Sequence, residues 1–113
     1  MFETTMSQYN TPILRANGKI IGNAVEALRR EMRTQIEQGG RHLILDLTDV
    51  PLLDSSALGA IIATLQALKK SDGKLVLLNP QEAVLNVLAV TRLDTVLEIY
   101  RDEADAVNAF SQG

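Results

Sequence analysis

Hydrophobic and polar positions follow one rhythm in the first twenty residues of this chain and a different one afterwards. Residues 2–9 alternate weakly between polar and apolar side chains, and an apolar run follows at residues 13–16. Alternation of this kind is typical of strands, so we expect two short strands joined near Asn10. Residues 17 and 18, Asn and Gly, favour a turn, after which residues 19–22 continue or end the second strand.

From residue 23 onward, stretches with apolar residues at every third or fourth position alternate with nearly continuous apolar runs, which are typical of helices and buried parallel strands, respectively. In chain order we expect a helix over 23–38, a strand over 43–47, a helix over 55–70, a strand over 74–78, a helix from 80 to about 91, a strand over 96–100 and a helix from 102 to about 110. Strands that alternate with helices connect through right-handed crossovers. The sequence therefore predicts an α/β fold with a mixed, largely parallel sheet of about five strands and about four helices, in which the first two strands form an antiparallel edge.

Two predicted helices carry sequence signals for their first turn. Asn79 is a suitable cap, Pro80 suits the first helical position, and Glu82 places a carboxylate three residues after the cap. Asp102 is the expected cap of the last helix. These signals fix where the third and fourth helices should begin.

Composition limits the kind of protein this can be. A chain of 113 residues with 46% hydrophobic and 4% aromatic residues predicts a single domain, residues 1–113, with an aliphatic core. The absence of cysteine excludes disulfides and thiolate chemistry. A net charge of -3 without a basic cluster argues against direct nucleic-acid binding. The first residues do not resemble a signal peptide and no apolar run approaches ~20 residues, so we expect a cytoplasmic protein without membrane insertion.

Catalytic and metal-binding groups are sparse. His42, the only histidine, lies at the start of a predicted strand, at the opposite end from Ser55 and Ser56, so a serine hydrolase site is not expected. Asp46, Asp49 and Asp54 together could hold Mg²⁺. Asp49 and Asp54 are placed equally well as turn and cap residues, however, and no phosphate-binding glycine motif is present. We expect no enzyme activity, no metal and no cofactor.

The most informative stretch is Asp54-Ser55-Ser56-Ala57-Leu58-Gly59, which lies between a buried strand ending in Leu45-Asp46-Leu47 and a helix. Side-chain oxygens there can accept hydrogen bonds from the first turn of the helix, and this capping role is the simplest interpretation. With the weaker signals at residues 73–77 and 79–80, however, the stretch resembles the STAS domain family (sulfate transporter and anti-sigma factor antagonist), especially its single-domain antagonists. The resemblance covers residues 13 to about 110.

This resemblance implies a phosphorylation switch. In the family, the serine directly after the loop aspartate is phosphorylated by an anti-sigma factor that is also a serine kinase, and a phosphatase resets it. By position the acceptor is Ser55, and Ser56 is the weaker candidate. The expected partner-binding residues are Asp54, Ser56, Ala57, Leu58 and Gly59, with Val84 and Val87 on the adjoining helix; core packing is the alternative for Leu58 and both valines.

The chain departs from the family pattern at three places. Ala57 replaces a usual glycine, Ile21 replaces an acidic residue of the kinase-facing surface, and residues 91–93 lack a glycine. Two other functions therefore stay open, namely a STAS scaffold subunit of a multi-protein signalling complex and an accessory STAS domain of a transport system. A homodimer is also compatible with the sequence.

Overall fold

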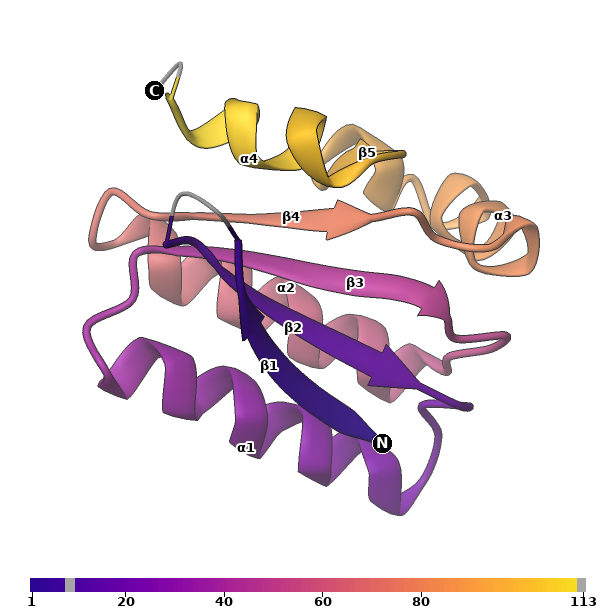
Figure 1. Ribbon diagram of the computed structural model, residues 1–113. Coiled ribbons are helices and arrows are strands. Elements are labelled where there is room, and N and C mark those ends of the chain that lie inside the picture. Colours follow the sequence, from indigo (N-terminus) through magenta and orange to yellow (C-terminus); the bar gives the residue numbers. More distant parts are fainter. Residues whose placement is uncertain (8–9, 112–113) are drawn as a thin grey trace.

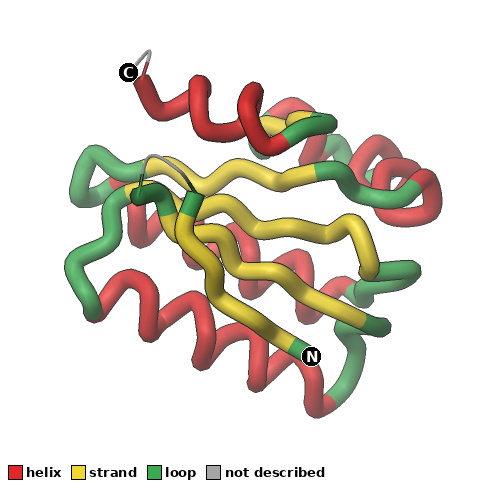
Figure 2. Tube along the Cα trace, viewed as in Figure 1, coloured by secondary structure: helices red, strands yellow, loops and turns green. Residues whose placement is uncertain are grey.

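A five-stranded sheet with helices on both of its faces forms the described part of the chain, residues 1–7 and 10–111 of a computed structural model (Figure 1). Strands occupy the centre and helices the outside (Figure 2). The elements are β1 (Phe2–Met6), β2 (Pro12–Asn17), α1 (Asn23–Glu37), β3 (His42–Asp49), α2 (Ser55–Lys69), β4 (Lys74–Leu78), α3 (Glu82–Val90), the 3-10 helix η1 (Leu93–Thr95), β5 (Glu98–Tyr100) and α4 (Glu103–Ser111).

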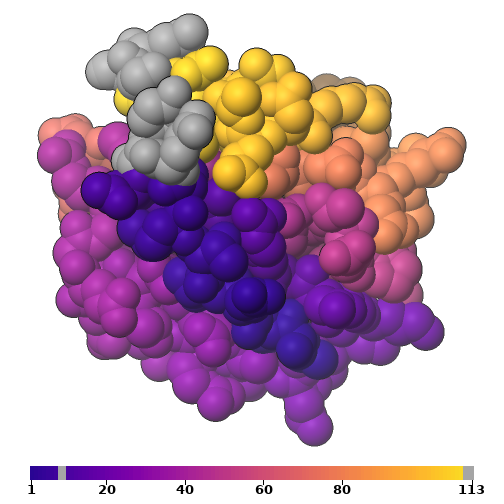
Figure 3. Space-filling model, viewed as in Figure 1, coloured from indigo at the N-terminus to yellow at the C-terminus, as the bar shows by residue number. Residues whose placement is uncertain are grey.

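The order of strands across the sheet is the same as their order along the chain, β1-β2-β3-β4-β5. β1 pairs antiparallel with β2, and all further pairs are parallel. β1 forms one edge of the sheet and lies on the outside of the molecule (Figure 3). The predicted α/β fold with a largely parallel sheet and an antiparallel edge is therefore confirmed.

Alternate residues of the central strands build two separate cores. Leu14, Leu45 and Leu77 face α1 and α2 and belong to the larger cluster, to which α3 also contributes. The intervening residues of the same strands face α4 in a smaller cluster, whose members include Ile13, Ile44 and Val76. Burial on both faces explains why these strands are nearly continuous apolar runs in the sequence.

The predicted start of α3 is wrong. Asn79 adopts a left-handed conformation with φ 50°, and its backbone N–H donates to the carbonyl of Tyr100 at 2.7 Å. Its side-chain amide donates to Thr48 Oγ1 at 3.3 Å instead of serving a helix. The helix begins at Glu82 after Gln81, whose side chain donates to the carbonyl of Thr48 at 2.9 Å. Contacts with the end of β3 thus override the local capping signal.

Two predicted strands are shorter than expected. β2 ends at Asn17, and of residues 19–22 only Ile20 forms an isolated parallel bridge, to Leu53. The last strand is limited to Glu98–Tyr100, because the left-handed Arg92 turns the chain into η1 just before it. Residues 8 and 9 of the first predicted strand lie outside the described residues. Within the described ranges, no helix has the length and apolar character needed to cross a bilayer.

Candidate functional site

The loop from β3 to α2 is held against the connection between β2 and α1. Ile20 donates its backbone N–H to the carbonyl of Leu52 at 2.9 Å, and its own carbonyl accepts from Asp54 N at 3.3 Å. Val50 and Leu53 anchor the loop, because both side chains are buried in the larger core. The start of α2 is therefore placed by backbone hydrogen bonds as well as by packing.

Asp54 is the cap of α2, as predicted. Its backbone is extended, with φ -99° and ψ 179°, and its Oδ1 accepts from the backbone N–H of Ala57 at 2.9 Å. Its Oδ2 accepts from the backbone N–H of Gly22 at 3.4 Å. The carboxylate thus satisfies one of the helix N–H groups that have no partner inside the helix and also ties α2 to the neighbouring connection.

Ser55 and Ser56 are the first two residues of α2, and both are exposed. Capping is performed by Asp54, and neither serine hydroxyl has a hydrogen-bond partner among the described residues. Both hydroxyls are therefore available to an incoming protein. The positive end of the helix dipole and the N–H groups of the first turn lie directly beneath them.

Several residues expected to contact a partner are part of the core instead. Ala57 is fully buried and Val84 is 1% exposed, so their side chains have no surface for direct contact. The helical period explains this outcome, because both positions face the sheet. Gly59 is exposed and Val87 is half-buried, so these two remain available.

An open, mainly apolar groove begins at Ser55 and runs between α2 and the segment that follows α3. Leu58, Gly59 and Ile62 contribute from α2, and Leu93 contributes from the opposite side, around a volume of about 390 Å³. Leu58 is 95% buried as a whole but still reaches this groove. Sequence reasoning missed Leu93, because no local pattern indicates that η1 lies beside α2.

Asp46, within β3, contributes to the fold. Asp46 is 8% exposed, and its Oδ2 accepts from Arg15 Nη1 at 2.7 Å. Its Oδ1 accepts from both the backbone N–H and the hydroxyl of Thr48, at 3.0 and 2.6 Å. Arg15 also donates to Glu103 Oε1 at 3.0 Å and so links the sheet to α4. In the described part of the chain, no cluster of three acidic or histidine side chains is arranged to hold a metal ion.

His42 lies far from the serines. It begins β3, an eight-residue strand that spans about 23 Å, and α2 follows the other end of that strand. Its ring stacks on Phe110 of α4 with centroids 4.5 Å apart. Burial, followed by the nearby charges of Arg41 and Lys74, lowers the pKa of His42 below its ordinary value of 6.5. The structure therefore does not bring a serine and a histidine together.

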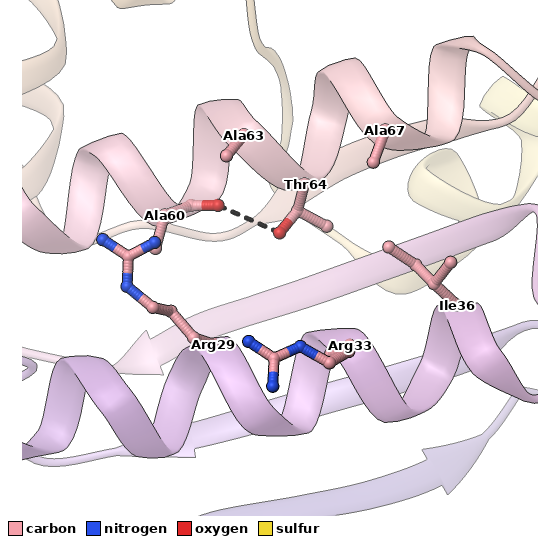
Figure 4. Close-up of a pocket in the computed structure, with 7 residues that line it drawn as sticks. All are labelled: Arg29, Arg33, Ile36, Ala60, Ala63, Thr64 and Ala67. Carbon is pink, nitrogen blue, oxygen red and sulfur yellow. Dashed lines mark hydrogen bonds between the residues drawn. The ribbon is translucent and has the colours of Figure 1, made fainter.

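A second hollow, of about 260 Å³, lies between α1 and α2 (Figure 4). Arg29 extends from α1 toward Ala60, and α2 presents a row of small side chains that includes Ala63 and Ala67 (Figure 4). The hydroxyl of Thr64 donates to the carbonyl of Ala60 at 2.9 Å. The lining of this hollow contains no acid, base or free nucleophile that could support a reaction. Ser55 and its surroundings are therefore the stronger candidate site.

Sequence and structure comparisons identify related proteins. The chain is 32% identical over 82 residues to the anti-sigma-B factor antagonist of Bacillus subtilis, a match that covers 73% of this chain and 74% of that protein. It is 35% identical over 72 residues to a protein of Thermotoga maritima named as a candidate anti-sigma factor antagonist, and this match spans 64% of each chain. The solved structure of the Bacillus cell fate determinant SpoIIAA in its phosphorylated form has a TM-score of 0.74 at 25% identity, covering 97% of this chain and 99% of that one.

The sequence pattern of the STAS domain matches residues 4–106, which is nearly the whole chain. The match includes the sheet, the Asp54 cap and the two exposed serines described above. This chain belongs to the STAS domain family.

Proposed function

We propose that this protein is an anti-sigma factor antagonist that binds an anti-sigma factor with serine kinase activity and is released when Ser55 is phosphorylated. The observation that carries the proposal is an exposed serine at the start of a helix that a neighbouring aspartate already caps. The similarity to antagonists of Bacillus subtilis and Thermotoga maritima supports the class of partner. The protein would be a non-enzymatic regulator in the cytoplasm.

The chemistry requires only a hydroxyl from this chain. The Ser55 oxygen would attack the γ-phosphorus of ATP held by the kinase, forming a new P–O bond while the bond to the leaving ADP breaks. The hydroxyl proton would pass to a base of the kinase, because Asp54 already accepts hydrogen bonds from Ala57 and Gly22. A phosphatase would hydrolyse the phosphoserine and restore the binding form.

The helix start should tolerate the added phosphate. Phosphorylation adds about -1.5 to -2 charges at neutral pH. At the first position of α2 these charges meet unpaired N–H groups and the positive end of the helix dipole, while Asp54 repels them at close range. These opposing contributions should leave the fold intact, so the switch would act on the interface.

The groove supports Ser55 rather than Ser56 as the acceptor. Ser55 lines one end of the groove that Leu58, Gly59 and Ile62 continue, whereas Ser56 is not part of its lining. A partner that fills this groove would remove water from the Ser55 side chain. Burying a phosphate there without a new cation would cost several kcal/mol, and ~1.4 kcal/mol already changes affinity tenfold.

The proposal is tested with the purified chain and its cognate kinase. Ser55→Ala should prevent phosphate transfer and bind the kinase persistently in the presence of ATP, whereas Ser55→Asp should bind at least tenfold more weakly. Ser56→Ala is the matched control, because it removes the adjacent exposed hydroxyl and should leave transfer intact. Intact mass spectrometry and calorimetry measure the two properties. Transfer to Ser56 alone, or equal binding by Ser55→Ala and Ser55→Asp, would contradict the proposed switch.

A further inference from the structure

We propose that the hollow between α1 and α2 is a docking groove for an acidic amphipathic helix of a partner protein, separate from the switch at Ser55. Arg29, Arg33 and Ile36 line the hollow from α1, and four small residues line it from α2, around about 260 Å³. Both helices cover the face of the sheet opposite to α4 (Figure 1). This hollow and the groove beside Ser55 have one lining residue in common, Ala63.

The α2 wall of the hollow is made of small side chains. Ala60, Ala63 and Ala67 recur at three- and four-residue spacing, so they share one side of the helix. From Ala60 to Ala67 this side extends over about 10 Å, which is two helical turns. Ala63 and Ala67 are exposed, so a helix of a partner could approach the backbone of α2 closely here.

The charged side chains of the lining are both positive. Arg29 extends from α1 toward Ala60, and Arg33 projects from the next turn of α1 (Figure 4). Arg29 Nε lies 3.5 Å from Glu26 Oε1. Arg33 is exposed and forms no ion pair or side-chain hydrogen bond within the described chain. Its planar guanidinium is therefore available to bind a carboxylate through two parallel hydrogen bonds.

The surrounding charges limit where an acid can bind. α2 contains no acidic residue, and two lysines stand at its C-terminal end. On α1, Glu26 and Glu37 lie about one turn from the arginines, on the edge of the helix that is farther from α2. Arg30 and Glu31 follow on sides that turn away from α2. Carboxylates of a partner are therefore favoured between the two arginines and α2, and they are repelled outside that position.

An acidic amphipathic helix matches both the charge and the shape of this groove. Two glutamates four residues apart lie one turn apart, as Arg29 and Arg33 do, and small apolar side chains beside them would face the alanines of α2. Two cations in a chain with a net charge of -3 are too few to hold a nucleic-acid backbone. With Glu26 and Glu37 beside them, they also give little attraction to an anionic membrane.

A designed peptide tests the groove directly. The probe is a helical peptide of about 15 residues with glutamates four residues apart beside an alanine face, and its control peptide has lysines in place of the glutamates. We expect the acidic probe to shift the amide NMR signals of Ala60, Ala63 and Ala67 and to leave the signals of α3 and α4 unchanged. The lysine peptide should bind about tenfold more weakly or not at all.

Substitutions separate the two arginines from the net charge of the chain. Arg33→Glu should weaken binding of the probe about fivefold, and the double variant Arg29→Glu/Arg33→Glu about tenfold or more. Arg30→Glu is the matched control, because it makes the same charge change outside the lining and should bind within about twofold. Ala67→Leu keeps both arginines but fills the hollow, so it should also weaken binding about tenfold. Urea unfolding should show all variants folded.

Several results would overturn the groove. These are no binding of the probe at millimolar concentration, equal binding of the acidic and lysine peptides, or equal losses in Arg30→Glu and Arg33→Glu. Phosphatidylglycerol vesicles that shift the same signals when the probe does not bind would assign the surface to a membrane instead. Ser55→Asp should bind the probe normally, and a loss of binding in this variant would place the probe at Ser55. The groove and the proposed switch can therefore fail separately.

Discussion

Replacing Asp54 by alanine should measure how strongly the start of α2 is fixed. The substitution removes the 2.9 Å bond from Ala57 N and the 3.4 Å bond from Gly22 N. Loss of an aspartate cap to alanine costs about 1 kcal/mol, and loss of a negative charge at a helix start costs about 0.3–1 kcal/mol. With a small contribution from the long bond to Gly22, we expect the free energy of unfolding to fall by about 2 kcal/mol.

Two further variants divide this loss into its causes. Asp54→Asn retains an oxygen acceptor for Ala57 and removes only the charge, so it should cost about 0.5–1 kcal/mol. Asp49→Ala removes an exposed aspartate without a side-chain hydrogen bond in the described chain, and should change stability by less than about 0.5 kcal/mol. Urea unfolding followed by far-ultraviolet circular dichroism, with equal m-values, provides the comparison. If Asp54→Ala were no more destabilising than Asp49→Ala, the capping argument would be wrong.

Other substitutions probe packing and titration. Gly59→Ala should raise the free energy of unfolding by about 0.5–1 kcal/mol, because nothing lies within 4 Å of an added Cβ. Gly73→Ala should lower the free energy of unfolding by about 2 kcal/mol or more, because the added Cβ would lie 2.0 Å from a backbone oxygen. Thermal unfolding measures both changes, and equal effects of the two substitutions would contradict the geometry. The lowered pKa of His42 means that the folded state binds fewer protons than the unfolded state. The stability present above pH 6.5 should therefore decrease as pH falls from 6.5 to the folded-state pKa. In urea titrations His42→Gln should flatten this pH dependence, and an unchanged slope would exclude His42 as its source. The hydrogen bond to Glu98 raises the pKa of Tyr100 to about 12, so Glu98→Gln should shift ultraviolet-detected phenol ionisation toward 10, and an unshifted titration would argue against that bond.

Hydrophobic periodicity was sufficient to predict the sheet and helices because each central strand is buried on both faces. The apolar runs in β3 and β4 leave no alternative to a central position. The start of α3 was not predictable in the same way. Asn79 and Pro80 carry a valid local helix signal, but Thr48, thirty-one residues earlier, receives the Asn79 side chain. A long-range polar contact of this kind leaves no trace in a local pattern.

In the candidate site, too, features that depend on neighbouring residues were predicted and features that depend on contacts between separate segments were not. Asp54, Ser55 and Ser56 were identified from the sequence because capping and exposure at a helix start depend on neighbouring residues. The proximity of Leu93 depends on how separate segments meet, so it was not predicted.

The agreement between strand order and chain order has a consequence for how this protein forms during synthesis. Each strand that leaves the ribosome finds its neighbour already made, so the sheet can grow by adding one strand at a time without waiting for a distant segment. The ion pair between Arg15 and Glu103 does depend on a distant segment, because it joins residues 88 positions apart. Docking of α4 on the sheet would therefore be the closing event, possible only after residue 103 has been translated.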